Sequence, residues 1–291
     1  MPRPFEGLRV LDLSNRLSGA FAARLFGDFG ASVTLAEPQD GHPLRGEPPF
    51  ASDDPGPDSG TLHAYANWNK QSLVIDDPDQ FKAVIEDADV IVTTTDPIST
   101  APYFNCLQNL QADAVHLSIT AHGLNDPLSG LPGNNLTASA RSGWSFINGY
   151  RDEPPLQLPR HQSGYVGGVT GFIAAAAALR RRDHGKSPEL VDVSELEALA
   201  LTGHPWAIGA IYNDHGFSYG AVGGKPRGQP GPPLWEVKDG RMSFGIWDFH
   251  NWSEAMAVMG IPELGLREEL IDRNHRHSQD ISDVMSGLAQ S

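Results

Sequence analysis

The sequence predicts an α/β protein built on a doubly wound, mostly parallel β-sheet. Over roughly the first 120 residues, short apolar runs alternate with segments of helical periodicity. Such alternation is typical of a parallel sheet with helices on both faces. The composition is that of a globular protein, with 40% hydrophobic and 20% charged residues among 291. The chain is therefore long enough for one large domain or two ordinary ones.

The first predicted strand is the apolar run Leu8–Leu13, and the first predicted helix is Ala20–Phe29, whose apolar side chains recur on one face. Gly30 follows it as a helix-ending glycine. The same pattern then continues toward residue 120. Strands are predicted over 31–36, 72–75, 89–93 and 114–119, with helices through 81–85 and over 103–110.

Two loops interrupt this pattern, 38–58 and 123–135, both rich in Gly, Pro and Asp. The first is either a surface loop or a flap over a ligand. Beyond them the sequence predicts helices over 136–148 and 167–182, a strand over 190–193 and a helix over 195–207.

The rest of the chain predicts a second, smaller domain. A Gly- and Pro-rich stretch over 212–233 is typical of a linker. It precedes two apolar runs separated by Asp239-Gly240, which is a hairpin signal, and helices over 252–259 and 281–288. We therefore expect a large domain over 1–211, a linker over 212–233 and a small α+β domain over 234–291.

Charge and composition exclude several classes of function. With 21 basic and 36 acidic residues the net charge is −15, and an acidic surface repels nucleic acid. An anionic small ligand needs only a local positive pocket. The single cysteine, Cys106, permits no intrachain disulfide and is expected to be a packing residue. No apolar run approaches the roughly 20 residues of a membrane span, and no signal-peptide core is present, so we expect a cytoplasmic protein without membrane contact.

The common motifs of nucleotide and hydrolase chemistry are missing. The turn after the first strand, Ser14–Gly19, holds one glycine instead of the dinucleotide-binding pattern, and neither a P-loop nor a Gly-x-Ser-x-Gly elbow occurs. His275 and His277 are two residues apart, so on a helix they would point to different faces, and Arg273 and Arg276 would repel a cation. We expect no metal site.

The order and spacing of many short motifs resemble the class III CoA-transferase family, which includes formyl-CoA transferase, carnitine CoA-transferases and α-methylacyl-CoA racemase. The resemblance covers nearly the whole chain. It is carried by Phe5–Ser14, Phe21–Leu25, Asp28–Ala31, Glu37-Pro38, Gly41 with Pro43–Arg45, Asn67–Leu73, Ala88–Ile91, Leu117–Thr120, Ser142-Gly143, Gly149, Pro154-Pro155, Ala177–Leu179, Arg182, Gly185 and Val191–Ser194.

The resemblance implies a Rossmann-like large domain, a smaller domain and two chains interlocked as rings. It also implies coenzyme A or acyl-CoA as a substrate, with no metal. In the transferases of this family an aspartate attacks the acyl-CoA thioester, carries the acyl group as a mixed anhydride and then forms an aspartyl-CoA thioester. In the racemases the same aspartate works with a histidine as an acid/base pair.

This chain departs from the family at both catalytic positions. The place of the aspartate falls on Gly164, or on Ser163 if the spacing slips by one residue, and the segment His161–Gly168 contains no carboxylate. The region of the racemase histidine is occupied by Asn134 and Asn135, which cannot shuttle a proton. Other carboxylates, such as Asp152, Glu153 and Asp192, are expected to be structural.

A third departure concerns the cofactor. The transferases commonly carry an Asn-Phe-Arg-Pro-like stretch after the fourth strand, and here Asp96 replaces its arginine within 94–97. Such a like charge opposes the phosphates of CoA. Arg45, Lys70 and Asn67 remain as candidate cofactor contacts, although isolated cations such as Arg45 and Lys70 are also ordinary surface residues.

The resemblance also implies a longer chain, since family members usually continue past the small domain and return to the first. We therefore predict a CoA-transferase subunit or half that lacks the catalytic aspartate and works with a related, aspartate-bearing subunit or as a homo-oligomer. Two alternatives stay open. One is an autonomous enzyme with diverged chemistry on an acyl-CoA or related carboxylic acid, and the other is a non-catalytic binding or scaffold protein that retains the fold.

Overall fold

The computed structural model describes residues 3–53, 55–75, 77–107, 113–147, 154–187, 190–202, 235–242 and 249–271. The chain divides into two compact units. The larger combines Met1–Ser142 with Leu158–Thr202, and the other combines Gly143–Gln157 with Gly203–Ser291. The predicted linker over 212–233 lies outside the described residues, so the predicted domain boundaries stay predictions. Within the described ranges, no helix has the length and apolar character needed to cross a membrane.

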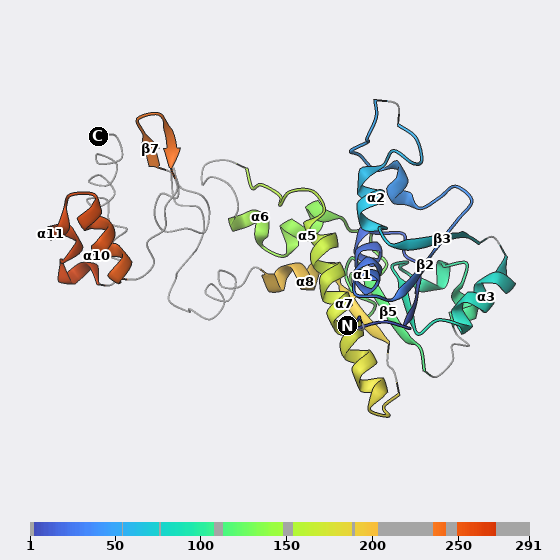
Figure 1. Cartoon of the computed structure of the whole chain (residues 1–291). Helices are drawn as coiled ribbons and strands as arrows, with labels where there is room; N and C mark the ends of the chain where they lie inside the picture. The colour runs from blue at the N-terminus through green and yellow to red at the C-terminus, as the bar shows by residue number, and fades with distance from the viewer. Residues whose placement is uncertain are drawn as a thin grey trace. The chain divides into compact units, whose positions relative to one another are not determined.

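A six-stranded, entirely parallel sheet forms the centre of the larger unit, which confirms the predicted α/β fold (Figure 1). The strand order is β3-β2-β1-β4-β5-β6, so the chain runs outward from β1 to one edge and then restarts at β4 toward the other. Ligands of such sheets bind where the order reverses, here between β1 and β4. The strands are β1 Arg9–Asp12, β2 Ser32–Glu37, β3 Lys70–Val74, β4 Val90–Thr93, β5 Val115–Thr120 and β6 Val191–Ser194.

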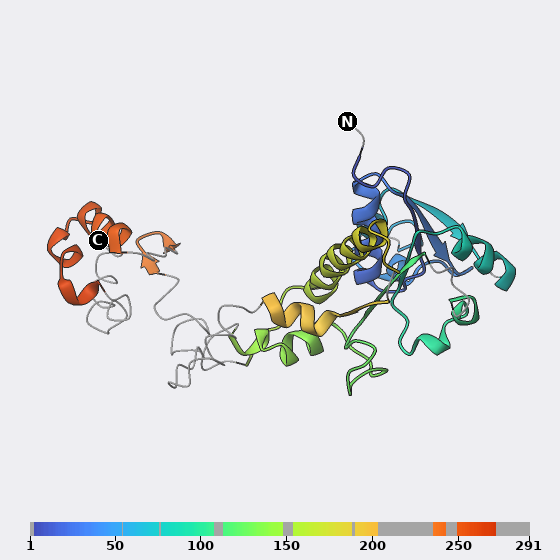
Figure 2. The ribbon, with the colours of Figure 1, turned by 90° about the horizontal axis from the view of Figure 1, so that it is seen from below.

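One face of the sheet is covered by α1 (Leu17–Asp28) and α7 (Gln162–Asp183), which lie side by side in Figures 1 and 2. Their small and aromatic side chains, including Ala22, Phe26 and Ala175, pack on β-branched and leucine residues of the strands. Phe26 is fully buried and lies edge-on to Phe172 of α7, with ring centroids 4.8 Å apart. Burying each such ring contributes about 1.5–3 kcal/mol.

The other face is covered by α3 (Pro78–Glu86) and α4 (Phe104–Leu107). Leu11 and Ile91 of the sheet pack there against Ile85 and Leu107. Cys106 lies partly buried against the same cluster, as expected of a packing cysteine. Successive side chains of a strand point to opposite faces, so Val10 of β1 packs in the core under α1 and α7 and Leu11 packs in the core under α3 and α4.

The helices predicted over 136–148 and 167–182 differ most from the structure. The helix predicted over 136–148 is interrupted: α5 (Asn135–Arg141) ends at Ser142, and Gly143 has a φ of 86° that breaks the helical path before α6 (Trp144–Ile147). The helix predicted to begin at Gly167 begins at Gln162.

The reason for the earlier start of α7 is its glycine-lined face, formed by Gly164, Gly167, Gly168 and Gly171. A Cβ on Gly168 would lie 2.7 Å from the backbone oxygen of Ser18, and a Cβ on Gly171 would lie 2.6 Å from Ile119. The glycines therefore allow close packing of α7 against α1 and the sheet.

Short elements complete the larger unit. They are η1 (Pro43–Gly46), α2 (Thr61–Ala66), η2 (Ile98–Thr100) and α8 (Glu195–Thr202). In the second unit, β7 (Trp235–Val237) and β8 (Gly240–Met242) pair as the predicted antiparallel hairpin. It also contains α10 (Phe249–Val258), α11 (Pro262–Gly265) and η3 (Glu268–Leu270), with Trp252 and Met256 buried.

Candidate active site

A cavity of about 550 Å³ opens at the carboxyl ends of β1, β4 and β5, where the strand order reverses. Each strand contributes the residues that directly follow it. Asn15 and Arg16 follow β1, Thr94–Asp96 follow β4, and Ala121 follows β5. The remaining lining residues are Pro43, Thr100 and Gly130–Gly133. This position is the usual ligand site of a doubly wound sheet.

Hydrogen bonds tie the cavity wall together. The backbone N–H of Asn15 donates to Thr94 Oγ1 at 2.8 Å, and the Thr94 hydroxyl donates to Asn15 Oδ1 at 2.8 Å. The Asp96 carboxylate accepts from the Gly130 N–H at 2.8 Å and from the Ser129 hydroxyl at 3.4 Å. The loop over 123–135 is therefore pinned to the end of β4 and forms one side of the cavity.

The guanidinium of Arg16 is held in place by the buried carboxylate of Glu195. Its Nε and Nη2 donate to the two oxygens of Glu195 at 3.0 and 2.8 Å, and Nη1 donates to the Gly133 carbonyl at 3.0 Å. Glu195 is 3% exposed and also accepts from the Ser18 hydroxyl at 2.7 Å. Burial lowers the pKa of Arg16, but the hydrogen bond and charge of Glu195 outweigh it, so the pKa lies above the ordinary value.

The predicted catalytic position lies in the first turn of α7. Ser163 and Gly164 are both buried. A Cβ on Gly164 would lie 3.2–3.4 Å from the Leu17 side chain, so a carboxylate built there would face an apolar side chain at close range. The assignment of the family aspartate to Gly164, or to Ser163 if the spacing slips, stays a prediction.

The two asparagines at the predicted histidine region have structural hydrogen bonds. Asn134 caps α5 by accepting from the Thr137 N–H at 3.1 Å. Asn135 Oδ1 accepts from the Ser163 N–H at 3.1 Å, while its Nδ2 donates to the Leu158 carbonyl at 3.0 Å. The Asn135 amide thus donates and accepts at the same time, and it fastens the start of α7 to α5.

The predicted cofactor contact Arg45 is paired with Glu37, the last residue of β2. Its Nε and Nη2 donate to the two Glu37 oxygens at 2.7 and 2.9 Å, and Nη1 donates to Asp58 at 3.1 Å. The hydrogen bond from Arg45, together with those from Ser72 and the His42 backbone, outweighs burial and lowers the pKa of Glu37 to about 2.

Lys70 and Asn67 lie in a second polar network. The Lys70 ammonium is 1% exposed and donates to Asp12, to the Ala20 carbonyl and to Asn67 Oδ1, each at 2.7 Å. The alternative that Lys70 is an ordinary surface residue is therefore wrong. Burial raises the pKa of Asp12, but the Lys70 charge and hydrogen bond outweigh it, so the pKa lies below the ordinary value. A phosphate contact by Lys70 stays a prediction that requires these bonds to open.

None of Arg45, Lys70 and Asn67 lines the cavity, whereas Asp96 does. The polar residues missed by the sequence patterns are Arg16 and Glu195. A signal for both exists, because each lies within a few residues of the carboxyl end of a predicted strand, and in a parallel sheet these ends lie together. This signal is separate from the glycine motifs that are typical of nucleotide-binding turns.

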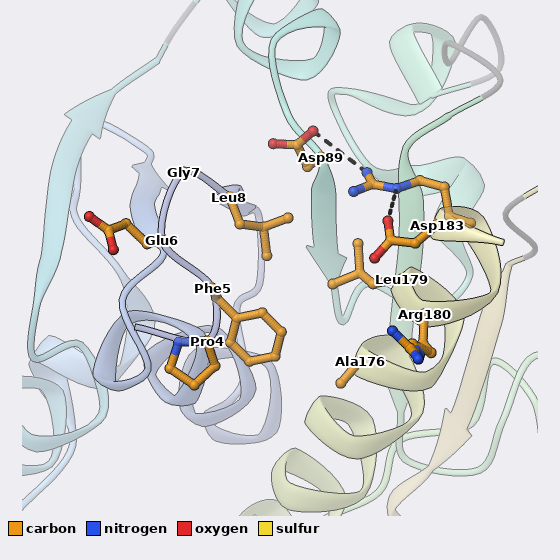
Figure 3. Close-up of a pocket in the computed structure, with 11 residues that line it drawn as sticks. Pro4, Phe5, Glu6, Gly7, Leu8, Asp89, Ala176, Leu179, Arg180 and Asp183 are labelled. Atoms are coloured by element: carbon orange, nitrogen blue, oxygen red, sulfur yellow. Dashed lines mark ion pairs between the residues drawn. The ribbon is translucent and has the colours of Figure 1, made fainter. Parts of the chain in front are cut away.

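A second pocket, of about 360 Å³, lies at the amino ends of β1 and β4, at the other end of the strands from the cavity (Figure 3). It is formed by the residues before β1 and β4 and by the end of α7. Within it Arg182 pairs with Asp89 at 3.6 Å and with Asp183 at 3.8 Å. This pocket is a weaker candidate than the cavity at the carboxyl ends.

No cluster of three metal-ligating side chains occurs in the described part of the chain. His275 and His277 lie outside it, so the prediction that they bind no metal is untested.

Comparison with known proteins points to one family. The family described as CoA-transferase family III matches residues 5–291. The chain is 28% identical over 209 residues to the succinyl-CoA:(R)-benzylsuccinate CoA-transferase subunit BbsE of Thauera aromatica, covering 69% of this chain and 51% of that protein. It is 26% identical over 281 residues to the succinyl-CoA:mesaconate CoA-transferase of Haloarcula hispanica, covering 89% and 68%. The chain thus spans about half the length of the first of these relatives.

Solved structures agree at the level of the fold. A CAIB/BAIF family protein from Brucella suis superposes with a TM-score of 0.79 at 19% identity, covering 99% of this chain and 78% of that one.

Proposed function

The chain belongs to CoA-transferase family III, and from this premise we propose that it is a subunit or half of an acyl-CoA:carboxylate CoA-transferase that lacks the catalytic aspartate. Its substrates are a CoA thioester and a carboxylic acid. The aspartate is supplied by a related chain. The relative BbsE is itself named as a subunit, which supports an assembly of unlike chains.

The observation that carries this proposal is the first turn of α7. No residue from His161 to Gly168 has a carboxylate, so no side chain there can form an aspartyl anhydride or thioester. The buried carboxylate next to this helix is Glu195, whose Cγ would lie 3.0 Å from a Cβ on Gly167. Both of its oxygens accept hydrogen bonds from Arg16, and Ser18 donates to one of them, which disfavours nucleophilic attack by Glu195.

The cavity supports weak binding of CoA by this chain alone. Asp96 brings a negative charge to the wall where the family commonly has a cation. Arg45 and Lys70 are already paired with Glu37 and Asp12. A CoA molecule would therefore meet one opposing charge and few free cations, unless another chain provides them.

Covalent trapping tests the proposal directly. The purified chain is mixed with succinyl-CoA, treated with hydroxylamine or borohydride and searched by mass spectrometry for modified Asp or Glu side chains. We expect no specific adduct on this chain. A specific adduct would overturn the proposal and favour an autonomous enzyme with diverged chemistry.

A matched pair of variants sharpens the test. Gly164→Asp places a carboxylate at the first predicted position, where the new side chain starts 3.2–3.4 Å from Leu17, and is expected to restore trace labelling. Ser163→Asp places it one residue earlier and is the matched comparison. Labelling of Ser163→Asp above Gly164→Asp would show that the spacing slips by one residue, and labelling of neither would show that the catalytic position is assigned wrongly.

Co-purification from the native source distinguishes the partner arrangements. We expect a related CoA-transferase chain bearing an aspartate at the start of its equivalent helix. A homo-oligomer that turns over acyl-CoA alone would contradict the subunit proposal. A chain that binds neither CoA nor a related chain would support the scaffold alternative.

A further inference from the structure

A buried histidine, His42, caps the short helix η1. Its ring is 2% exposed, and its Nδ1 accepts a hydrogen bond from the Leu44 N–H at 3.1 Å. A backbone N–H can only donate, so Nδ1 carries no proton and the ring proton is on Nε2. The hydrogen bond therefore fixes His42 as a neutral ring of one tautomer.

A neighbouring histidine, His63 of α2, is fixed in the same way. The Lys70 ammonium donates to Asn67 Oδ1 at 2.7 Å, so the Asn67 Nδ2 is the group that lies 3.0 Å from His63 Nδ1 and donates to it. This ring is therefore neutral as well. The centroids of the two rings are 5.7 Å apart, so a proton on either ring would oppose a proton on the other.

Charged or titratable side chains surround His42 from each of the neighbouring elements. They are Asp12 of β1, Glu37 of β2, Lys70 of β3, His63 of α2 and Arg45 of η1. Both carboxylates favour a charged ring, but each is already paired with a cation. Burial outweighs their attraction and lowers the pKa of His42 below its ordinary value, and burial likewise lowers the pKa of His63 to about 4. At neutral pH both rings therefore stay uncharged.

The helix η1 connects the wall of the cavity to the segment before α2. Pro43 in η1 lines the cavity at the carboxyl ends of the strands. Arg45 in η1 donates to Glu37 at 2.7 Å, to the Pro57 carbonyl at 3.2 Å and to Asp58 at 3.1 Å. A loss of η1 would therefore alter the cavity wall and release this segment together.

We propose that His42 is an acid-sensitive latch on η1, whose neutral ring keeps η1 closed and whose protonation opens it. A second proton, on Nδ1, would point at the Leu44 N–H, so that two donors face each other and the cap is lost. Opening moves Pro43 out of the cavity wall and Arg45 away from its partners. Access to the cavity then depends on pH. This inference does not rest on the proposed function.

The direction and size of the effect follow from the burial of the neutral ring. In the open state His42 has its ordinary pKa of 6.5, so below this pH the open state takes up a proton that the closed state does not. The closed state is therefore fully stable above about pH 6.5 and loses stability as the pH falls toward the lower pKa of the buried ring. With one proton linked to opening, the ratio of open to closed η1 rises about threefold from pH 7 to pH 6 and up to about twentyfold from pH 7 to pH 5.

Hydrogen exchange measured by NMR on the full chain tests the latch. Each amide rate at pH 7 and pH 5 is divided by the rate of an unstructured peptide at the same pH, which gives a protection factor. We expect the factors of Leu44 and Arg45 to fall by about ten- to twentyfold at pH 5, while those of β1 and α1 stay the same. A fall of less than about twofold, or an equal fall in β1 and α1, would overturn the proposal. So would a ring ¹⁵N spectrum at pH 7 in which His42 Nδ1 carries a proton.

Asparagine is the matched replacement for His42, because its Oδ1 can take the place of the ring Nδ1, accepts from the Leu44 N–H and does not titrate. A circular dichroism melt verifies that each variant folds. His42→Asn is expected to keep the Leu44 protection factor equal within about twofold at pH 7 and pH 5. His63→Asn is the control for the neighbouring ring and should retain the pH dependence.

The two variants also show which group senses the acid. A pH dependence that persists in the folded His42→Asn variant, or that disappears in His63→Asn, would assign the sensitivity to another group and refute the latch. Neither result changes the expectation for covalent trapping, so the latch and the subunit proposal stand or fall separately.

Discussion

Replacing Lys70 by methionine tests the buried network in which the Lys70 ammonium binds Asp12, the Ala20 carbonyl and Asn67. Methionine keeps the length and apolar character of the side chain and removes the ammonium. The change strips Asp12, which is fully buried, of its counterion and of one hydrogen bond. What remains on Asp12 is the bond from the Ser14 N–H at 2.9 Å.

The magnitude follows from this geometry. Removing one partner of a buried ion pair costs about 3–5 kcal/mol, because an uncompensated charge stays in the interior. The Ala20 carbonyl and the Asn67 side chain lose a donor as well. We expect the free energy of unfolding to fall by about 4 kcal/mol, equivalent to a melting temperature lower by roughly 10 °C for a unit of this size.

The assay is urea unfolding followed by circular dichroism, with a double-mutant cycle. Lys70→Met/Asp12→Asn removes both charges and is expected to recover about half of the loss, since no unpaired charge remains. A loss of less than about 1 kcal/mol in Lys70→Met would refute the buried pair.

The same variant separates the two roles of Lys70. If its ammonium is structural, the dissociation constant for CoA, measured below the melting transition, is the same in Lys70→Met as in the wild type. A tenfold weaker constant in a folded variant would show that the predicted phosphate contact exists.

Three further changes test other parts of the larger unit. Gly168→Ala should lower the free energy of unfolding by about 2 kcal/mol or more, because the new Cβ lies 2.7 Å from a backbone oxygen, whereas Gly46→Ala, with open space around it, should change it little. Asp96→Arg should tighten CoA binding about tenfold by calorimetry, because an opposing charge becomes an attractive one. Burial lowers the pKa of His116 from 6.5 to about 4, so the unfolded chain takes up a proton at a higher pH than the folded one. The contribution of neutral, buried His116 to the free energy of unfolding is then fully present above about pH 6.5. It falls by about 2 kcal/mol between pH 7 and pH 5, and His116→Gln should reduce this loss in urea titrations.

Each of these has a contrary outcome. An alanine at 168 as stable as the wild type would mean that α7 is free to move away from α1. CoA affinity unchanged by Asp96→Arg would place the phosphates elsewhere. A pH profile identical in the wild type and the His116 variant would assign the acid sensitivity to other groups.

The sheet was predictable from the sequence because each strand has a local apolar pattern. Leu8–Leu13 contains β1, and the strand predicted over 114–119 differs from β5 by one residue at each end. The start of α7 was not predictable from local pattern. Its glycines weaken an isolated helix, and contacts with residues far away in sequence, such as Ser18 and Ile119, explain their presence.

The site was predictable only in part. Family spacing predicts that the catalytic position falls on Gly164 or Ser163, and the structure shows that both residues are buried at the start of α7. The pairing of Arg16 with Glu195 joins residues 179 positions apart, which no periodicity reveals. Lys70 was a candidate phosphate contact on family resemblance alone. Its burial beside an equally buried carboxylate was not predictable, because a lysine is rarely buried unless it is paired.

The glycine-lined face of α7 bears on how firmly the start of this helix is held. At Gly168 the helix rests against the backbone oxygen of Ser18, and a backbone has less freedom to move aside than a side chain. Ser163 and Gly164 lie about one turn earlier on the same helix, so the same contact holds their Cα atoms in place. An engineer who introduces a carboxylate at either position would therefore change one side chain and keep the scaffold.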